Sequence, residues 1–142
     1  MKKSLIIISI IVLSIISIFV YKFYNYQAMK NASIKNNKVY ESFFNEQVLG
    51  TDVISLINKA IDNNDKNEVQ KDSNGQYIDN GKNSVQIEIK FLELDKTISM
   101  EAINGQGYTQ FVHNFGTYNF KCTKIEYHNS TKNVKYMYFE QI

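Results

Sequence analysis

The sequence contains no arginine, and all 16 of its basic residues are lysines. The planar guanidinium group, which binds phosphate or carboxylate through two hydrogen bonds at once, is therefore missing from the whole chain. The formal charge of +2 comes from Lys2 and Lys3, because the other lysines equal the 14 acidic residues in number. A neutral body lacks the basic stripe of a nucleic-acid-binding protein. We therefore expect no nucleic-acid partner.

The single cysteine, Cys122, excludes a disulfide within the chain. It alternates with Tyr118 and Phe120, which predicts a position inside a strand, where a lone thiol is usually buried and inert. His113 and His128 have no neighbour at the spacing of a metal site, so we expect each to lie on the surface or to cap an element. No phosphate loop, nucleophile elbow or cofactor fingerprint occurs either. The sequence predicts no metal, no cofactor and no catalytic residue.

Charge, glycine and proline are also missing from residues 4–21, a run that begins directly after Lys3. As a helix this run is about 27 Å long, close to the roughly 30 Å of bilayer hydrocarbon. Aromatic residues of the kind found at a membrane interface mark its end: Phe19, Tyr21, Phe23, Tyr24 and Tyr26. Residues 1–21 are therefore predicted to be a transmembrane anchor that binds the lipid bilayer.

A cleaved signal peptide is the alternative interpretation of this segment, and it would make the protein a secreted one. Signal peptides usually have a shorter apolar run, about 7 to 15 residues, and end at two small residues spaced by one. Here Tyr26 and Ala28 take those places, so we favour an uncleaved anchor. The short basic tail favours a single-pass protein of the cell membrane with its C-terminal domain outside.

Residues 22–49 are predicted to continue the helix as a juxtamembrane stalk, because their large apolar residues repeat at helical spacing. Residues 50–142 are predicted to form an extracytoplasmic α+β domain. Its first helix would be capped by Thr51 and Asp52, end at Asn63, and bury one apolar face: Val53, Leu56, Ile57, Ala60 and Ile61.

The segment from residue 62 to residue 84 is almost entirely polar. Two Asn-Gly pairs favour turns, and we expect a loop with a short hairpin that pairs residues 69–71 with residues 76–78. A calcium loop starting at Asp72 would need glycine sixth and glutamate twelfth, but glycine comes fourth and Asn83 twelfth. Asparagine is abundant in the whole chain, with 17 residues, and we interpret this bias first as AT-rich coding.

Residues 85–91 alternate between apolar and polar and predict a strand with one buried face. Two short helices are expected next, at residues 99–104 and 108–115. The second has an aromatic face, which we interpret as core, and Gly116 at its C′ position.

Residues 117–128 and 133–141 predict an antiparallel hairpin at the C-terminus. The fold class is therefore α+β: a transmembrane helix, then a small domain of helices packed on an antiparallel sheet with a C-terminal β-hairpin. The large residues at 136–139 imply that the last strand is either covered on both sides or presents aromatic groups to solvent. In the second case they would form a face for protein or glycan partners, with these candidates: Tyr136, Tyr138, Tyr127 and Phe139.

This layout of long helix, polar loop, strand and terminal hairpin loosely resembles the pilin-like membrane-anchored proteins, including minor pilins and pseudopilins, of Gram-positive bacteria. The resemblance covers layout and not motif. Members carry a basic leader cut by a prepilin peptidase and a glutamate in the apolar helix, whereas here Ser4 and Leu5 follow Lys3 directly and the first glutamate is Glu41. The resemblance implies assembly through the apolar helix, with the C-terminal sheet exposed to partners.

Three functions stay open at this point. The first is a non-enzymatic, single-pass protein whose outer domain binds a protein partner as part of an envelope or secretion assembly. The second is a membrane-tethered hydrolase of an envelope polymer, which would need a carboxylate pair from the scattered acidic residues: Glu88, Glu93, Asp95, Glu101, Glu126 and Glu140. The third is a secreted protein released by signal-peptide cleavage. The sequence does not indicate an oligomeric state.

Overall fold

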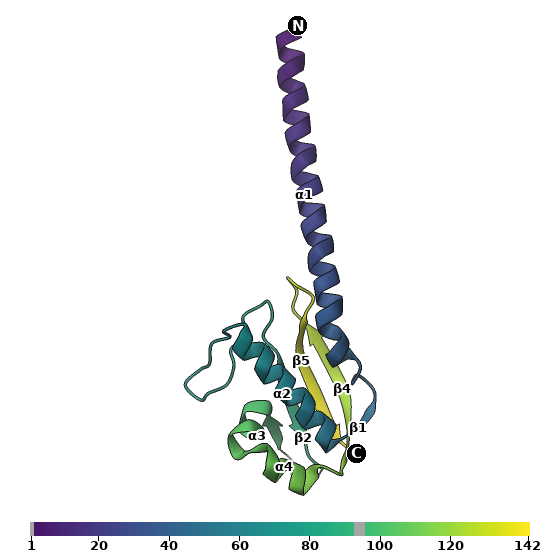
Figure 1. Cartoon of the computed structure of the whole chain (residues 1–142), viewed down its shortest axis with the longest axis vertical. Coiled ribbons are helices and arrows are strands. Elements are labelled where there is room, and N and C mark those ends of the chain that lie inside the picture. The colour runs from purple at the N-terminus through teal and green to yellow at the C-terminus, as the bar shows by residue number, and fades with distance from the viewer. Residues whose placement is uncertain (1, 93–95) are drawn as a thin grey trace.

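The computed structural model describes residues 2–92 and 96–142. One long helix projects from a small domain of helices and strands (Figure 1). The elements follow in the order α1 (Lys2–Glu41), β1 (Gln47–Leu49), α2 (Gly50–Lys66), β2 (Gln86–Lys90), β3 (Thr97–Ser99), α3 (Met100–Gln106), α4 (Tyr108–Phe115), β4 (Asn119–Tyr127) and β5 (Val134–Gln141). The predicted α+β class is confirmed.

Helix α1 is continuous for 40 residues, and its apolar half lies outside the domain. Residues 3–26 are all exposed. Within the part of the chain that the structure describes, this is the one helix long and apolar enough to cross a membrane, a test that an N-terminal signal sequence also meets. The hydroxyl groups of Ser9, Ser14 and Ser17 donate to carbonyl oxygens four residues earlier at 2.8–3.0 Å. These serines are satisfied within the helix and require no polar partner in lipid.

The last turns of α1 pack on the domain through three buried side chains: Ser33, Asn37 and Tyr40. The helix ends at Glu41, so the prediction of a helical stalk over residues 22–49 is wrong beyond this point. The chain turns at Asn45, which has a positive φ of 62°. Asparagine tolerates this conformation better than most residues do. The amide of Asn45 donates to the carbonyl of Cys122 at 3.0 Å. This turn brings residues 47–49 beside β4 as a strand of the sheet.

Helix α2 buries the apolar face that the sequence predicts. It begins at Gly50, where a Cβ atom would lie 2.1 Å from the carbonyl oxygen of Phe115, so the close approach to α4 requires glycine. Asp52 still supports the helix start, because its carboxylate accepts a hydrogen bond from the amide of Leu49 at 3.3 Å. The helix continues to Lys66, almost one turn beyond the expected end.

The strands form one five-stranded sheet in the order β1-β4-β5-β2-β3. Neighbours are antiparallel except β2 and β5, which run parallel with Ile87 opposite Met137 and Ile89 opposite Phe139. The predicted antiparallel hairpin is confirmed, but the prediction of a wholly antiparallel sheet is wrong. Between β2 and β5 the chain passes through β3, α3, α4 and β4, and this long connection allows parallel pairing.

One face of the sheet, the inner face, is fully buried: Ile87, Ile89, Phe120, Cys122, Met137 and Phe139. The opposite side, the outer face, carries polar and tyrosine side chains that are exposed or half-buried: Gln86, Glu88, Lys124, Glu126, Tyr136 and Tyr138. The helices belong to the inner side, where their apolar residues join the core. The sheet therefore has one packed face and one face open to solvent.

A bulge in β4 decides which charged residues reach the outer face. The pairing of β4 with β5 shifts between Cys122 and Lys124, so that Thr123 is an extra residue. Strict alternation after Cys122 would turn Lys124 and Glu126 into the core. With the bulge, Ile125 faces inward opposite Met137, and both charged residues face outward.

Helices α3 and α4 match the two helices that the sequence predicts, and β3 before them was not expected. Ser99 caps α3, its hydroxyl accepting from the amide of Ala102 at 3.4 Å. The aromatic face of α4 belongs to the core, with the rings of Phe91 and Phe115 4.5 Å apart. Gly116, which was expected at the C′ position, is instead the C-cap residue of α4, with a φ of −59° in the right-handed helical region.

The polar segment between α2 and β2 contains the predicted hairpin as a single antiparallel bridge between Lys71 and Tyr77. Its turn is organised by Asp72, whose Oδ1 accepts from the amides of Asn74 and Gln76 at 2.8 and 2.9 Å. Gly75 in the same turn has a φ of 78°. The Asp72 carboxylate thus stabilises a turn, as the sequence predicts.

Candidate functional site

The four predicted partner-binding residues do not share one surface. Tyr136 and Tyr138 lie on the outer face, two residues apart on β5. Phe139 is fully buried on the inner face, because neighbouring strand residues point to opposite sides. Tyr127 lies beside the hairpin turn, next to Glu126, the strand partner of Tyr136, but its hydroxyl donates to Oε1 of Glu41 on α1 at 3.0 Å. The prediction of a common aromatic face is corrected to the pair Tyr136 and Tyr138.

Tyr136 is held in a defined orientation. Its hydroxyl donates to Oε2 of Glu88 on the neighbouring strand at 2.7 Å. Burial raises the pKa of this phenol, and the Glu88 carboxylate raises it further. The ammonium group of Lys124 lies 5.5 Å from the ring centroid and 2.6 Å from Oε1 of Glu126. The ring is therefore fixed on the sheet with a paired charge beside it.

An open groove runs along the outer face beside Tyr136, with a volume of about 480 Å³ that includes open solvent. One side is formed by residues 79–84, hereafter the 79–84 loop, and the floor by the strands. Its lining side chains are Asp79, Ser84, Gln86, Lys124, Glu126, Lys135 and Tyr136. Because most of these lining residues are charged or hydrogen-bonding, we treat this groove as the candidate site.

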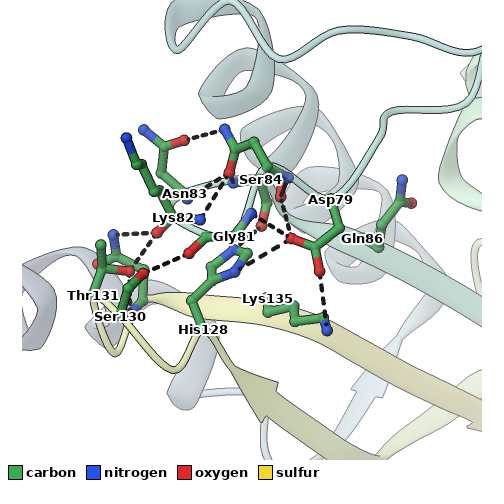
Figure 2. Close-up of polar contacts among 12 residues, drawn as sticks. Asp79, Gly81, Lys82, Asn83, Ser84, Gln86, His128, Ser130, Thr131 and Lys135 are labelled. Carbon is green, nitrogen blue, oxygen red and sulfur yellow. Dashed lines mark hydrogen bonds and ion pairs between the residues drawn. The ribbon is translucent and has the colours of Figure 1, made fainter.

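Asp79 connects the loop to the sheet across this groove. Its Oδ2 lies 3.0 Å from Nζ of Lys135, and its Oδ1 accepts from the amide of Gly81 at 2.7 Å (Figure 2). The Gly81 hydrogen bond, together with Lys135 and His128, lowers the pKa of this carboxyl group. Asp79 is thus an ionised acceptor on the groove wall, with a partner on each side.

The 79–84 loop is built around the side chain of Asn80. Its Oδ1 accepts from the amides of Lys82, Asn83 and Ser84 at 2.9–3.1 Å. Its Nδ2 donates to Oδ1 of Asn83 at 2.6 Å. The carboxamide of Asn80 therefore supplies the hydrogen-bond acceptor that these backbone amides would otherwise lack.

The hairpin turn between β4 and β5 supports the loop from below (Figure 2). Ser130 donates to the carbonyl of Gly81 at 2.5 Å, and both Thr131 and Asn133 donate to the carbonyl of Lys82. Side chains of one loop thus satisfy the backbone of another loop 49 or more residues away. The groove wall is a cross-linked structure rather than a free loop.

His128 was expected at the surface or as a cap, and it is buried, with 2% of its area exposed. Its Nε2 lies 2.7 Å from the carbonyl oxygen of Ser84 and donates to it, while Nδ1 lies 3.5 Å from Oδ1 of Asp79. The Ser84 hydroxyl accepts from the amide of Asn80 instead. Serine, histidine and aspartate are close, but the histidine faces the serine carbonyl, so this is not the arrangement of an activated nucleophile.

Cys122 is buried in the core, as the sequence predicts. Its Sγ donates to the carbonyl of Lys124 at 3.4 Å. Burial raises the pKa of this thiol to about 11. It therefore has the environment of an inert packing residue, not of a nucleophile.

In residues 2–92 and 96–142 no three histidine, cysteine or acidic side chains converge as metal ligands. His113 is exposed, with Nδ1 3.1 Å from Oδ1 of its neighbour Asn114. Glu93 and Asp95, two of the carboxylates considered for a hydrolase, lie outside the described residues. The arrangement that the structure does provide is a groove lined by hydrogen-bond donors, acceptors and one aromatic ring.

The contribution of His128 was missed because its partner, the carbonyl of Ser84 44 residues earlier, is brought near by the fold. The partners of Asn80 lie only two to four residues along the chain, and the turn was predicted from the sequence without this side chain. The signal in the sequence was weak: the Asn80-Gly81 pair predicts a turn, but it does not indicate which part of the chain packs against that turn. Lys124 and Glu126 alternate along β4 in the way that is typical of a solvated sheet face, and they pair there at 2.6 Å.

Comparison with known proteins adds no relative to this description. No family model, no curated protein and no solved structure matches the chain. The resemblance in layout to pilin-like proteins therefore stays a prediction.

Proposed function

We propose that this protein is a non-enzymatic, single-pass membrane protein whose extracytoplasmic α+β domain binds a protein partner, as a component of an envelope or secretion assembly. Helix α1 would hold the domain at the membrane, and the outer face of the sheet would contact the partner. The observation that carries the proposal is the division of one unbroken helix, α1, into an exposed apolar half and a polar half whose last turns pack on the domain.

Support for the anchor comes from the apolar residues of α1. Side chains such as Leu13 and Ile18 are 62% and 57% exposed, an arrangement that is unfavourable in water and favourable in lipid. The domain supplies no surface that covers them, because packing against it begins only near Ser33.

Support for the binding surface comes from the outer face near its far end. Leu49 of β1 and Ile142 lie on either side of Asn119, and they are 45% and 53% exposed. Tyr138 lies on the same face, toward the middle of β5. Exposed apolar and tyrosine side chains on an uncovered sheet suit a protein interface. We therefore place the partner at Tyr138, Leu49 and Ile142.

The anchor is tested on the full-length protein in its native membrane. We expect it to stay in the membrane pellet after alkaline carbonate extraction, and protease added outside the cell to remove the domain. Mass spectrometry of the N-terminus gives the deciding result. A mature chain that begins beyond Ala28 would overturn the anchor and favour the secreted form.

The binding surface is tested by a photo-crosslinking amino acid placed at position 138 in cells, with position 113 on α4 as the exposed control. We expect one protein to be crosslinked from position 138 and not from position 113. The double variant Leu49→Ser and Ile142→Ser should lower its yield, and serine at position 49 is also a favourable N-cap for α2. Equal crosslinking from both positions would contradict this surface.

A further inference from the structure

The groove beside Tyr136 has balanced charges. Four charged side chains line it, and they form two pairs: Lys135 with Asp79 at 3.0 Å, and Lys124 with Glu126 at 2.6 Å. No ammonium group is left over for a phosphate, and the chain has no arginine to supply one. An anionic ligand would have to break a pair to gain a partner, so the charge pattern favours a neutral ligand.

A single aromatic ring lines the groove. Tyr136 is the one aromatic lining residue, and the others are charged, amide or hydroxyl side chains. Aliphatic side chains, which supply most of the buried core of a protein interface, are missing from the lining. A ring surrounded by hydrogen-bonding groups matches a pyranose, whose C–H face is apolar and whose hydroxyl groups both donate and accept.

The groove is also preformed. The hydroxyl of Tyr136 is fixed by Glu88 at 2.7 Å. The opposite wall is fixed by His128 and Ser130, which donate to the carbonyls of Ser84 and Gly81. A site whose walls are already ordered loses little entropy when a weakly interacting neutral ligand binds.

We propose that this groove is a carbohydrate-binding site that takes a segment of a neutral polysaccharide, with one pyranose ring stacked on Tyr136. Asp79 and Glu126 accept hydrogen bonds from its hydroxyl groups, and Lys124 and Lys135 donate to its oxygens. The site goes beyond the proposed protein-binding function and uses a different part of the outer face. It relies on that function only for access to polymers outside the membrane.

The test uses the full-length protein in a detergent without a sugar headgroup, because a maltoside would compete for the groove. Isothermal titration calorimetry is run with neutral hexamers of N-acetylglucosamine and of glucose, and with the anionic hexamer of galacturonic acid. We expect at least one neutral hexamer to bind, with an affinity that changes little with salt, and the anionic hexamer to bind more weakly.

Three variants locate the binding. Tyr136→Ala should weaken it roughly tenfold, the size expected when an aromatic contact is removed from a binding site. Tyr136→Phe keeps the ring and should stay close to the native protein. Tyr118→Ala is the matched control, since Tyr118 is 47% exposed at the far end of the sheet and does not line the groove.

The outcomes separate this site from the protein-binding function. Absence of binding by every neutral hexamer, preference for the anionic one, or unchanged affinity in Tyr136→Ala would each overturn the carbohydrate site. If Tyr136→Ala does not fold, Glu126→Gln and Lys124→Ala replace it, because both side chains are largely exposed. Crosslinking from position 138 is measured independently, so either proposal can fail alone.

Discussion

The side chain of Asn64 forms two hydrogen bonds with the backbone of Val85, one in each direction. Its Nδ2 donates to the carbonyl of Val85 at 2.8 Å, and its Oδ1 accepts from the amide of Val85 at 2.8 Å. Asn64 is fully buried. A helix side chain thus gives the residue before β2 the pair of bonds that a neighbouring strand would provide.

Replacing Asn64 by alanine should therefore destabilise the domain strongly. Both backbone groups of Val85 would lose their partners in a buried site, which costs roughly 2 to 5 kcal/mol of the free energy of unfolding. Urea unfolding of the full chain in detergent micelles measures this loss. Asn129→Ala, at an exposed asparagine, should change the midpoint little, and equal effects of the two variants would contradict the role of Asn64.

Asn37 forms hydrogen bonds with the backbone at the start of β5, as Asn64 does before β2. It accepts from the amide of Val134 and donates to the carbonyl of Lys132, both at 2.8 Å. Asn37→Ala should release the hairpin from α1 and speed hydrogen exchange at the Val134 amide by roughly tenfold or more. Asn36→Ala is the matched control on an exposed position of the same helix. Unchanged exchange in Asn37→Ala would show that this contact does not hold the hairpin.

Acid should weaken the groove wall through Asp79. Its pKa is lowered in the folded protein, first by the hydrogen bond from Gly81 and then by Lys135. A lowered folded pKa means that the carboxylate stabilises the fold above its unfolded pKa of about 3.8 and loses this contribution as the pH falls through the folded value. The unfolding midpoint should thus drop less between about pH 5 and about pH 2 in Asp79→Asn than in the native protein. A parallel pH profile would contradict the linkage.

Cys122 should resist alkylation in the folded protein. With a pKa of about 11, roughly one thiol in a thousand is ionised at pH 8, and burial blocks access as well. Iodoacetamide labelling followed by mass spectrometry should reach Cys122 only after denaturant is added. A cysteine introduced at the exposed neighbour, Thr123→Cys, should react within the same period without denaturant. Rapid native labelling of Cys122 would exclude a packing role.

The proposed membrane span would be inserted with a narrow margin of free energy. A lysine at Val12 should cost about 2.5 to 3.5 kcal/mol of membrane insertion. This penalty offsets a large part of the gain from the apolar residues of an 18-residue run that also contains four serines. Val12→Lys should therefore reduce the membrane-bound fraction in cell fractionation. Ile34→Lys is the control, because it changes a similarly exposed residue of α1 beyond the apolar run, and this variant should stay membrane-bound. Loss of both variants from the membrane would indicate misfolding rather than failed insertion.

Local pattern was enough to predict the elements that carry the core. The apolar run, the one-sided face of α2, the alternation of β2 and the terminal hairpin each have a period that a single segment reveals. The strands β1 and β3 were missed because three residues are too few to show a period. Residues 47–49 were assigned to a helix by the spacing of Phe44 and Val48, whereas pairing with β4 decides their structure.

Features that depend on distant partners were beyond the sequence. The parallel pairing of β2 with β5 follows from where the helices return the chain, and no dipeptide encodes it. The abundance of asparagine was attributed to coding bias, yet Asn37, Asn64 and Asn80 each bond backbone groups that need a partner. The bulge at Thr123 did leave a trace, because the spacing from Cys122 to Ile125 breaks the alternation.

Helix α1 has no glycine and no proline between Lys2 and Glu41, so it behaves as a rigid lever rather than as a tether. From Tyr21 to Tyr40 the lever is about 28 Å long. A tilt of about 20°, which is usual for a single span, therefore displaces the domain sideways by roughly 10 Å and turns the outer face with it. In the proposed membrane anchor, the thickness of the bilayer would set this tilt and, through it, the height and direction of the outer face above the membrane.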